Sequence, residues 1–206
     1  MHRRILTLLL FTLFLISGAQ AQTAQTETKD DETNLDTQLY LIVGTNQDVA
    51  DSKLPSSLDS VIKQLRATMP FKNYRLAATL LNRVKNEGRL DLGWVGAPLA
   101  SSLVPGQPPM TRSSFGVRQV RLARNSEGQS TVQLIGFKFN ATIPVQVNAA
   151  AVADNKPVPP VFNYEGTNLS TDISMREGEP VIVGTLNVGP SGDAIILVVS
   201  AKRTTK

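Results

Sequence analysis

The 206-residue sequence contains no cysteine, and its single histidine is His2. Without cysteine the chain can form no disulfide, so its stability must come from a buried core. Histidine and cysteine also supply the usual ligands of zinc, copper and haem sites and the key groups of Ser-His-Asp and Cys-His mechanisms. We therefore expect no cofactor, no metal site and no catalytic residue, so that the protein is not an enzyme.

Other common signs of function are also scarce. The sequence has no Gly-rich phosphate loop and no nucleophile-elbow pattern. Arg118, Arg121 and Arg124 lie close together, but on an extended segment they fall on both faces, which is typical of a solvated strand and predicts no nucleic-acid partner. The one tryptophan, Trp94, is either a half-buried core residue or a stacking contact for sugar or peptide, and the pattern favours the core.

The amino end carries the three-part pattern of an export signal. Basic residues at 2–4 precede an apolar run over 5–17, and the small residues Ala19 and Ala21 form a cleavage site. The run is shorter than the ~20 apolar residues that a transmembrane helix needs. We predict a signal peptide over residues 1–21, cleavage before Gln22, a periplasmic or secreted location and no stable membrane insertion afterwards. An uncleaved amino-terminal anchor is the alternative.

The remaining chain divides into a linker and one domain. Residues 22–37 are polar and without periodicity, which predicts a disordered linker. Its acidic run, Asp30-Asp31-Glu32, lacks the alternating ligands and glycine turn of a calcium loop, so we expect it to be solvated. Residues 38–206 are predicted to form a single domain of ordinary size.

The first half of this domain indicates a strand followed by a helix. The apolar run 39–43 predicts a buried strand. A helix is expected to start at Ser56 or Ser57 as its cap and to end before Pro70, because apolar residues repeat at helical spacing between them. These are Leu58, Val61, Ile62, Leu65 and Met69. One face of this helix should cover a sheet.

Residues 74–84 are ambiguous between helix and strand, because their leucines satisfy both periods. We favour a strand that forms a hairpin with residues 89–95 through a turn at 85–88. The following segment, Ala97–Arg112, holds four prolines and is predicted to be a long loop.

The second half indicates antiparallel β structure, because apolar segments alternate with turn residues. Its predicted strands are 117–123, 131–140, 142–148, 169–175, 180–188 and 194–201. The run 194–199 is apolar on both faces and should be a central strand, with Ile196 and Val198 pointing the same way. The predicted fold class is α+β, mainly antiparallel β arranged as a sandwich or packed sheet, with one amphipathic helix near the amino terminus.

Two arrangements could support catalysis without histidine or cysteine. Ser60 and Lys63 match the S-x-x-K spacing of penicillin-binding proteins and β-lactamases, but the S-D-N and K-T-G motifs are absent, which favours an ordinary polar helix flank. Asp172, Glu177 and Glu179 surround a predicted tight turn, where acidic residues are commonly solvated rather than paired for hydrolysis.

The carboxy-terminal region resembles that of bacterial secretins, the outer-membrane rings of secretion and pilus systems. In that family a stretch like R-D-G-x-x-V-x-x-G-G-L precedes a strand ending in T-P-R. Residues 176–184, REGEPVIVG, match the first part, whereas Thr185 stands where a second glycine is expected and Ser200-Ala201-Lys202 replaces the threonine-proline ending. The likeness covers residues 169–203, and the chain is too short to make such a ring alone. The resemblance implies an accessory or divergent module of an envelope assembly.

These observations together predict a non-enzymatic exported envelope protein that acts as a protein-interaction or assembly module. The resemblance to secretins suggests that it is an accessory of a secretion or pilus system. Its partner would be another envelope protein, bound along a sheet edge such as those that Pro144 and Pro180 indicate. Two alternatives stay open. One is an envelope hydrolase or lyase that uses carboxylates or the Ser60–Lys63 pair, and the other is a module that binds an envelope polymer through Trp94.

Overall fold

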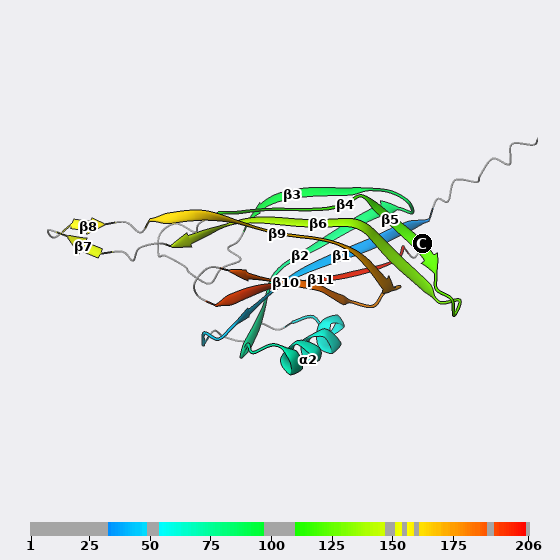
Figure 1. Cartoon of the computed structure of the whole chain (residues 1–206), viewed down its shortest axis with the longest axis horizontal. Coiled ribbons are helices and arrows are strands. Elements are labelled where there is room, and N and C mark those ends of the chain that lie inside the picture. Colours follow the sequence, from blue (N-terminus) through cyan, green and yellow to red (C-terminus); the bar gives the residue numbers. More distant parts are fainter. Residues whose placement is uncertain are drawn as a thin grey trace, which may run out of the picture. The chain divides into compact units, whose positions relative to one another are not determined.

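The computed structural model describes residues 33–48, 54–96, 110–146, 151–153, 156–158, 161–188 and 192–204. The predicted signal peptide over 1–21, its cleavage before Gln22 and the acidic run at 30–32 lie outside the described residues. The described part is built mainly of antiparallel strands with one short helix, α2 (Asp59–Thr68), which confirms the predicted α+β class (Figure 1).

One sheet, here called sheet A, has four antiparallel strands in the order β10-β11-β1-β2. Their bounds are Asn34–Thr45 for β1, Asn73–Lys85 for β2, Val181–Val188 for β10 and Asp193–Arg203 for β11. β1 and β11 are therefore central, as expected for strands that are apolar on both faces. β2 and β10 form the edges.

The second sheet, sheet B, is organised around the long strand β6 (Ser130–Gln146). β9 (Phe162–Arg176) pairs along one side of β6, while β4 (Thr111–Val117) and β5 (Gln119–Arg124) follow one another along the other side. β3 (Leu90–Gly96) pairs with β4 at the edge. Two short strands, β7 (Ala151–Ala153) and β8 (Lys156–Val158), pair with each other.

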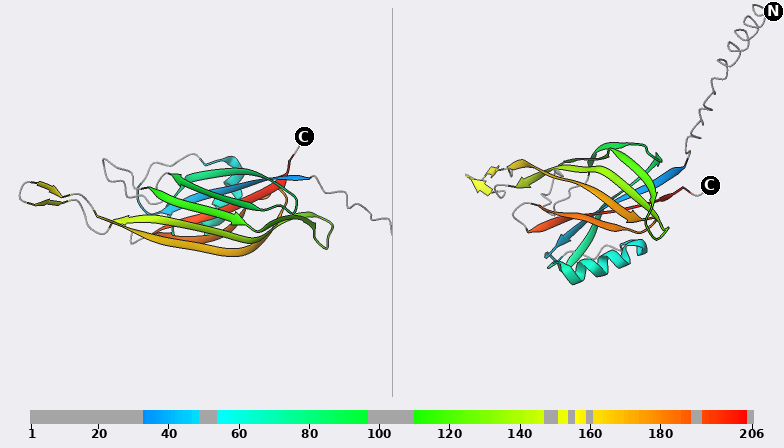
Figure 2. Two further views of the ribbon diagram at one scale, coloured as in Figure 1. Left: turned by 90° about the horizontal axis from the view of Figure 1, so that it is seen from above. Right: turned by 45° about the vertical axis from the view of Figure 1, so that its right-hand side comes forward.

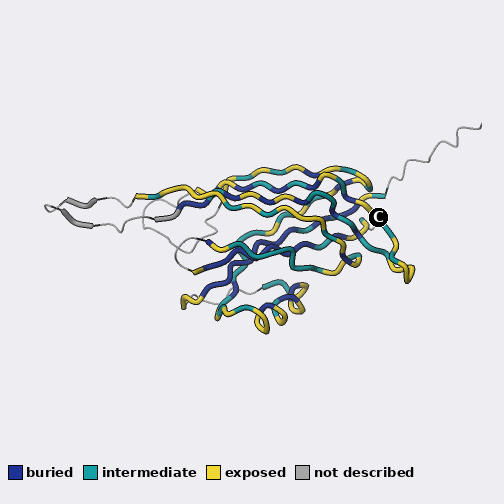
Figure 3. The backbone as a smooth tube through the Cα atoms, viewed as in Figure 1, coloured by how far each residue is buried: buried dark blue, intermediate teal, exposed yellow. Residues whose placement is uncertain are grey.

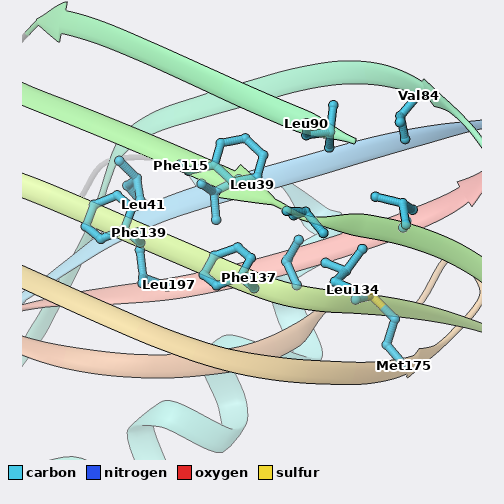
Figure 4. Close-up of a cluster of buried hydrophobic side chains, with 14 of the residues drawn as sticks. Leu39, Leu41, Val84, Leu90, Phe115, Leu134, Phe137, Phe139, Met175 and Leu197 are labelled. Carbon is cyan, nitrogen blue, oxygen red and sulfur yellow. The ribbon is translucent and has the colours of Figure 1, made fainter. Parts of the chain in front are cut away.

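Two hydrophobic clusters hold three layers together. The larger cluster lies between the sheets, where Leu39, Leu41 and Leu197 of sheet A meet Phe137 and Phe139 of sheet B (Figure 4). The smaller cluster lies on the other face of sheet A, where α2 covers it (Figure 2). Where α2 covers it, sheet A is therefore buried on both faces, and many of the buried residues lie on its central strands β1 and β11 (Figure 3).

The helix confirms the predicted element but not its start. Leu58, Val61 and Leu65 are buried against sheet A, as the helical spacing indicates. The first turn is a 3-10 turn, η1 (Ser56–Leu58), that follows Pro55, and neither serine side chain caps the helix.

Strand boundaries differ from prediction at several places. β4 begins at Thr111, inside the predicted loop, and β9 begins at Phe162, whereas its predicted strand begins at 169. β1 begins at Asn34, inside the segment 22–37 predicted to be a linker, because Leu35 and Thr37 are buried and paired with β2 and β11. β6 is continuous through Pro144, where two strands were predicted. Proline is tolerated there because β4 pairs with β6 only as far as Thr142, so that within the described residues β6 pairs with β9 alone beyond this point.

The strand prediction for residues 74–84 is confirmed, but the hairpin is wrong. β2 belongs to sheet A and β3 to sheet B, so the turn between them crosses from one sheet to the other. This turn contains Glu87 with φ 64° and is tied down by hydrogen bonds between Glu87, Gly88 and Val120 of β5. The predicted loop 97–112 lies outside the described residues up to 109, and its last two residues belong to β4.

Candidate functional site

The outer face of sheet A is only partly covered by α2. Beyond the helix, a groove of about 650 Å³ lies over the end of the sheet where β1 begins. It is lined by Asp36, Thr37, Gln38, Tyr40, Ser57, Leu81, Asn82, Arg83, Gly178, Pro180, Ser200 and Lys202. All four strands of sheet A or the segments next to them thus contribute to one hollow.

An ion pair forms part of the groove lining. The Nε of Arg83 on β2 donates to the Asp36 carboxylate on β1 at 2.8 Å, and the Thr204 hydroxyl donates to the same carboxylate at 2.9 Å. Asp36 and Arg83 are opposite each other in the β1–β2 register. Hydrogen bonding from Arg83 holds the pKa of Asp36 below its ordinary value, with a smaller contribution from Lys202. Asp36 is therefore a fixed anion near neutral pH.

Tyr40 marks the boundary between the groove and the helix-covered core. Its ring is buried in the smaller cluster, while its hydroxyl donates to Gln38 Oε1 at 2.7 Å and lies 3.4 Å from Ser57 Oγ. The groove wall next to the helix is thus fixed by hydrogen bonds, whereas the wall formed by β2 is open.

That open wall carries the most exposed large apolar side chain in the described part of the chain, Leu81, at 68%. It stands on β2 opposite Gln38, on the same face as Arg83. In the described residues no strand pairs with the side of β2 that faces away from β1. A groove and a free strand edge therefore meet at Leu81.

A second ion pair joins Glu177 and Arg203, neither of which lines the groove. The Glu177 carboxylate accepts hydrogen bonds from the Arg203 backbone N–H at 2.9 Å and from its Nε and Nη2 at 3.0 and 2.9 Å. Arg203 also donates to Ser130 Oγ of β6 at 2.8 Å, so the pair joins the two sheets. Hydrogen bonding from Arg203 lowers the pKa of Glu177. This carboxylate is a structural anion.

The acidic residues Asp172, Glu177 and Glu179 have separate surroundings and do not form a carboxylate pair for hydrolysis. Asp172 lies on β9, where its Oδ1 accepts a hydrogen bond from the Gly136 backbone N–H at 2.5 Å. Glu177 binds Arg203, and Glu179 is exposed after the turn. Within the described residues no three acidic, histidine or cysteine side chains gather as a metal site would require.

The Ser60–Lys63 spacing does not form a dyad. Both side chains are exposed on α2, and no hydrogen bond joins them within the described residues. The buried face of the helix is formed by Val61 and Leu65 instead. Burial raises the pKa of Tyr74, whose hydroxyl donates to the Leu65 carbonyl at 3.0 Å. This tyrosine is a structural link between β2 and α2.

Trp94 is half-buried on β3 and packs against the inter-sheet core, with its ring centroid 6.4 Å from that of Phe139, which confirms the core interpretation. The three arginines are exposed, as predicted. Arg118 lies at the bend between β4 and β5, and Arg121 is 4.0 Å from Glu87. Among the described residues, no helix is both long enough and apolar enough to cross a membrane.

Sequence reasoning missed the groove itself. Its residues come from four strands that are distant in the sequence, so no local motif marks them. Leu81 gives no warning of it in the sequence, because only the register with Gln38 shows that this leucine lies on a polar row of the sheet.

No protein-family model and no curated protein matches the chain. Among solved structures it is similar to secretins. These include the InvG secretin of the Salmonella type III secretion injectisome, at 9% identity and a TM-score of 0.34, covering 84% of this chain and 65% of that one. The Klebsiella pneumoniae type II secretion outer membrane complex with PulD matches at 11% identity and a TM-score of 0.33, covering 84% of this chain and 39% of that one.

The V. cholerae type IV competence pilus secretin PilQ matches at 10% identity and a TM-score of 0.31, covering 84% of this chain and 59% of that one. The chain thus spans between 39% and 65% of the length of these three chains. At these TM-scores the likeness does not assign a function. Because it covers most of the chain, it also does not confine the resemblance to residues 169–203.

Proposed function

We propose that the protein is an exported, non-enzymatic interaction module of the cell envelope that binds an extended strand of another envelope protein along the free side of β2. The observation that carries the proposal is the open edge of β2, where the exposed Leu81 borders the groove on sheet A. Strand addition supplies affinity through main-chain hydrogen bonds and specificity through pockets for alternate side chains.

β2 is an edge that is well suited to accept a strand. It has 13 residues, and its stretch 78–85 pairs with β1 without irregularity, since the register shift lies at Ala77. A long edge without proline or inward-pointing charge is open to pairing. The middle of β2, 76–81, is free of charge and proline.

Two other edges, β10 and β3, are less suitable. β10 follows Pro180, has a register shift between Ile182 and Gly184, and contacts β9 so closely that a side chain at Gly184 would meet Leu169. β3 has only 7 residues, including Asp91 and two glycines. Twisted, short or glycine-containing edges resist strand addition.

The charge on β2 favours an acidic partner. Arg75, Arg83 and Lys85 are the charged residues of this strand, and all are basic. Opposite charges on directly facing strand positions stabilise pairing, whereas like charges oppose it. Because Arg83 already pairs with Asp36, we expect the incoming strand to carry an acidic residue near Arg75 and an apolar residue that packs on Leu81.

A role as an accessory of a secretion or pilus system is the finer part of the proposal. Its support is the resemblance of residues 176–184 to the secretin motif, together with the predicted export signal. The enzyme alternative is less favoured. Among the described residues, the carboxylates with shifted pKa values are Asp36 and Glu177, and in both an arginine partner lowers the pKa. A general acid needs a raised pKa instead.

The test is affinity purification of the tagged mature protein from its native envelope, comparing Leu81→Lys with Val95→Lys. Both replace an exposed apolar residue on an edge strand, since Val95 is 56% exposed on β3. A lysine at the pairing edge of β2 should reduce recovery of the partner more than about tenfold, because edge lysines oppose strand addition. The Val95 variant should recover it normally. Equal recovery by both variants would remove the support for β2.

A further inference from the structure

The strand register determines which residues share the outer face of sheet B. Across β3, β4, β6 and β9, three successive rows point away from the core. The rows are Asp91, Gly116, Lys138 and Ser170; Gly93, Ser114, Asn140 and Asn168; and Val95, Arg112, Thr142 and Gly166. None of these residues is buried, whereas their neighbours Phe115 and Phe139 are.

This face, here called the B face, is mainly polar. Asn140 Nδ2 donates to Ser114 Oγ at 3.3 Å, which shows that side chains of adjacent strands meet on it. Val95 is its one large apolar side chain in these rows. A surface of amides and hydroxyls offers both donors and acceptors, and its small apolar content distinguishes it from the Leu81 edge.

Glycines leave parts of the backbone uncovered on the B face. A side chain added at Gly166 would meet nothing within 4 Å, and at Gly93 the nearest atom would be the Ser113 carbonyl oxygen at 3.9 Å. Glycine within a strand often marks a close approach by a ligand. Two hollows, of about 480 and 340 Å³, lie along the face and share Ser114 and Asn140.

The charge of the B face is positive. Arg112, Arg118 and Lys138 line the two hollows and are exposed, and within the described residues no carboxylate lies at ion-pair distance from them. The nearby carboxylates are already engaged. Asp91 pairs with Arg89 at 2.8 Å, and Asp172 accepts the hydrogen bond from Gly136. The face therefore presents cations that lack protein counter-charges.

We propose that the B face binds an anionic polysaccharide. The amides of Asn140 and Asn168 would bind sugar hydroxyls, while Arg112 and Lys138 would bind the acidic groups of the polymer. Its three rows contain no aromatic ring, and the two aromatic residues that line the hollows, Trp94 and Phe115, pack in the inter-sheet core. This disfavours single-stranded nucleic acid, because that ligand needs exposed stacking platforms. The site is separate from the β2 edge and does not rest on the proposed function.

The test measures binding of the full mature protein to polygalacturonate, with neutral dextran and a single-stranded DNA oligomer as comparisons. The double variant Arg112→Gln/Lys138→Gln should bind polygalacturonate about tenfold more weakly, since each exposed ion pair contributes modestly. Lys63→Gln/Arg66→Gln, on α2, removes the same charge from another surface and should bind as the unmodified protein does.

A second variant tests polar recognition apart from charge. Asn140→Ala/Asn168→Ala keeps every charge and should weaken binding about fivefold through lost hydrogen bonds. Retained thermal unfolding midpoints would show that these proteins are folded. Equal loss in the α2 variant, undiminished binding in both B-face variants, or equally tight binding of dextran or DNA would overturn the proposal.

Discussion

Shortening a buried side chain of β11 to alanine should destabilise the protein strongly, because this strand lies in the layer shared by both hydrophobic clusters. Ile196 and Val198 are fully buried, and both belong to the cluster beneath α2, so they point the same way as predicted. Replacing a buried isoleucine by alanine removes three carbons and leaves a cavity. We expect a loss of about 3 to 4 kcal/mol for Ile196→Ala, and about 2 to 3 kcal/mol for Val198→Ala.

Urea unfolding of the mature protein measures these losses through the midpoint at constant slope. Leu81→Ala is the matched control, because Leu81 is exposed and its truncation should change stability by less than about 0.5 kcal/mol. If Ile196→Ala and Val198→Ala both leave the midpoint unchanged, then β11 is not central and the layered arrangement is refuted.

Three further outcomes are expected. Glu177→Gln should cost about 1 kcal/mol at pH 7 by weakening its bonds to Arg203. Since the pKa of Glu177 is lowered by folding, this contribution is present above its ordinary pKa and is lost as pH falls below about 4.5, so acid unfolding curves of the two proteins should converge. Gly44→Ala should cost about 1 to 3 kcal/mol in thermal unfolding, because its new methyl would overlap the Phe71 ring at 2.6 Å. Ser60→Ala should leave the biological role intact in a complementation assay, and a lost phenotype in a folded variant would favour the serine–lysine enzyme.

The central layer of the fold was predictable because it depends on local patterns of apolar residues. The runs 39–43 and 194–199 are apolar at every side-chain position that must be buried on both faces, and the helix beside them has a clear apolar stripe. Both signals are local, so the sequence predicts the elements without knowledge of the topology.

The connections were less predictable, because alternation of apolar residues does not tell which sheet a strand joins. The turns at 86–89 and 177–180 each lead from one sheet to the other, although turn residues like theirs also occur in hairpins. The start of β1 was missed because Leu35 is a single apolar residue among polar neighbours, and its burial depends on contacts from the facing sheet.

The candidate surfaces were predictable in kind but not in place. Proline next to β10 correctly indicated an edge, but the edge with the groove is β2, and its Leu81 looks like a core residue in the sequence. The B face could not be foreseen because its rows join residues from four strands. Register across a sheet is a tertiary property, so neither surface has a local motif.

Hydrogen exchange of the backbone amides tests the central claim most directly, measured on the mature protein alone and in complex with its purified partner. Strand addition would form new main-chain hydrogen bonds along β2. The account predicts that exchange slows in residues 78–85 on binding, and that Leu81→Lys abolishes this protection. Protection confined to β9, β10 or α2, with β2 exchanging at its free rate in a saturated complex, would contradict it.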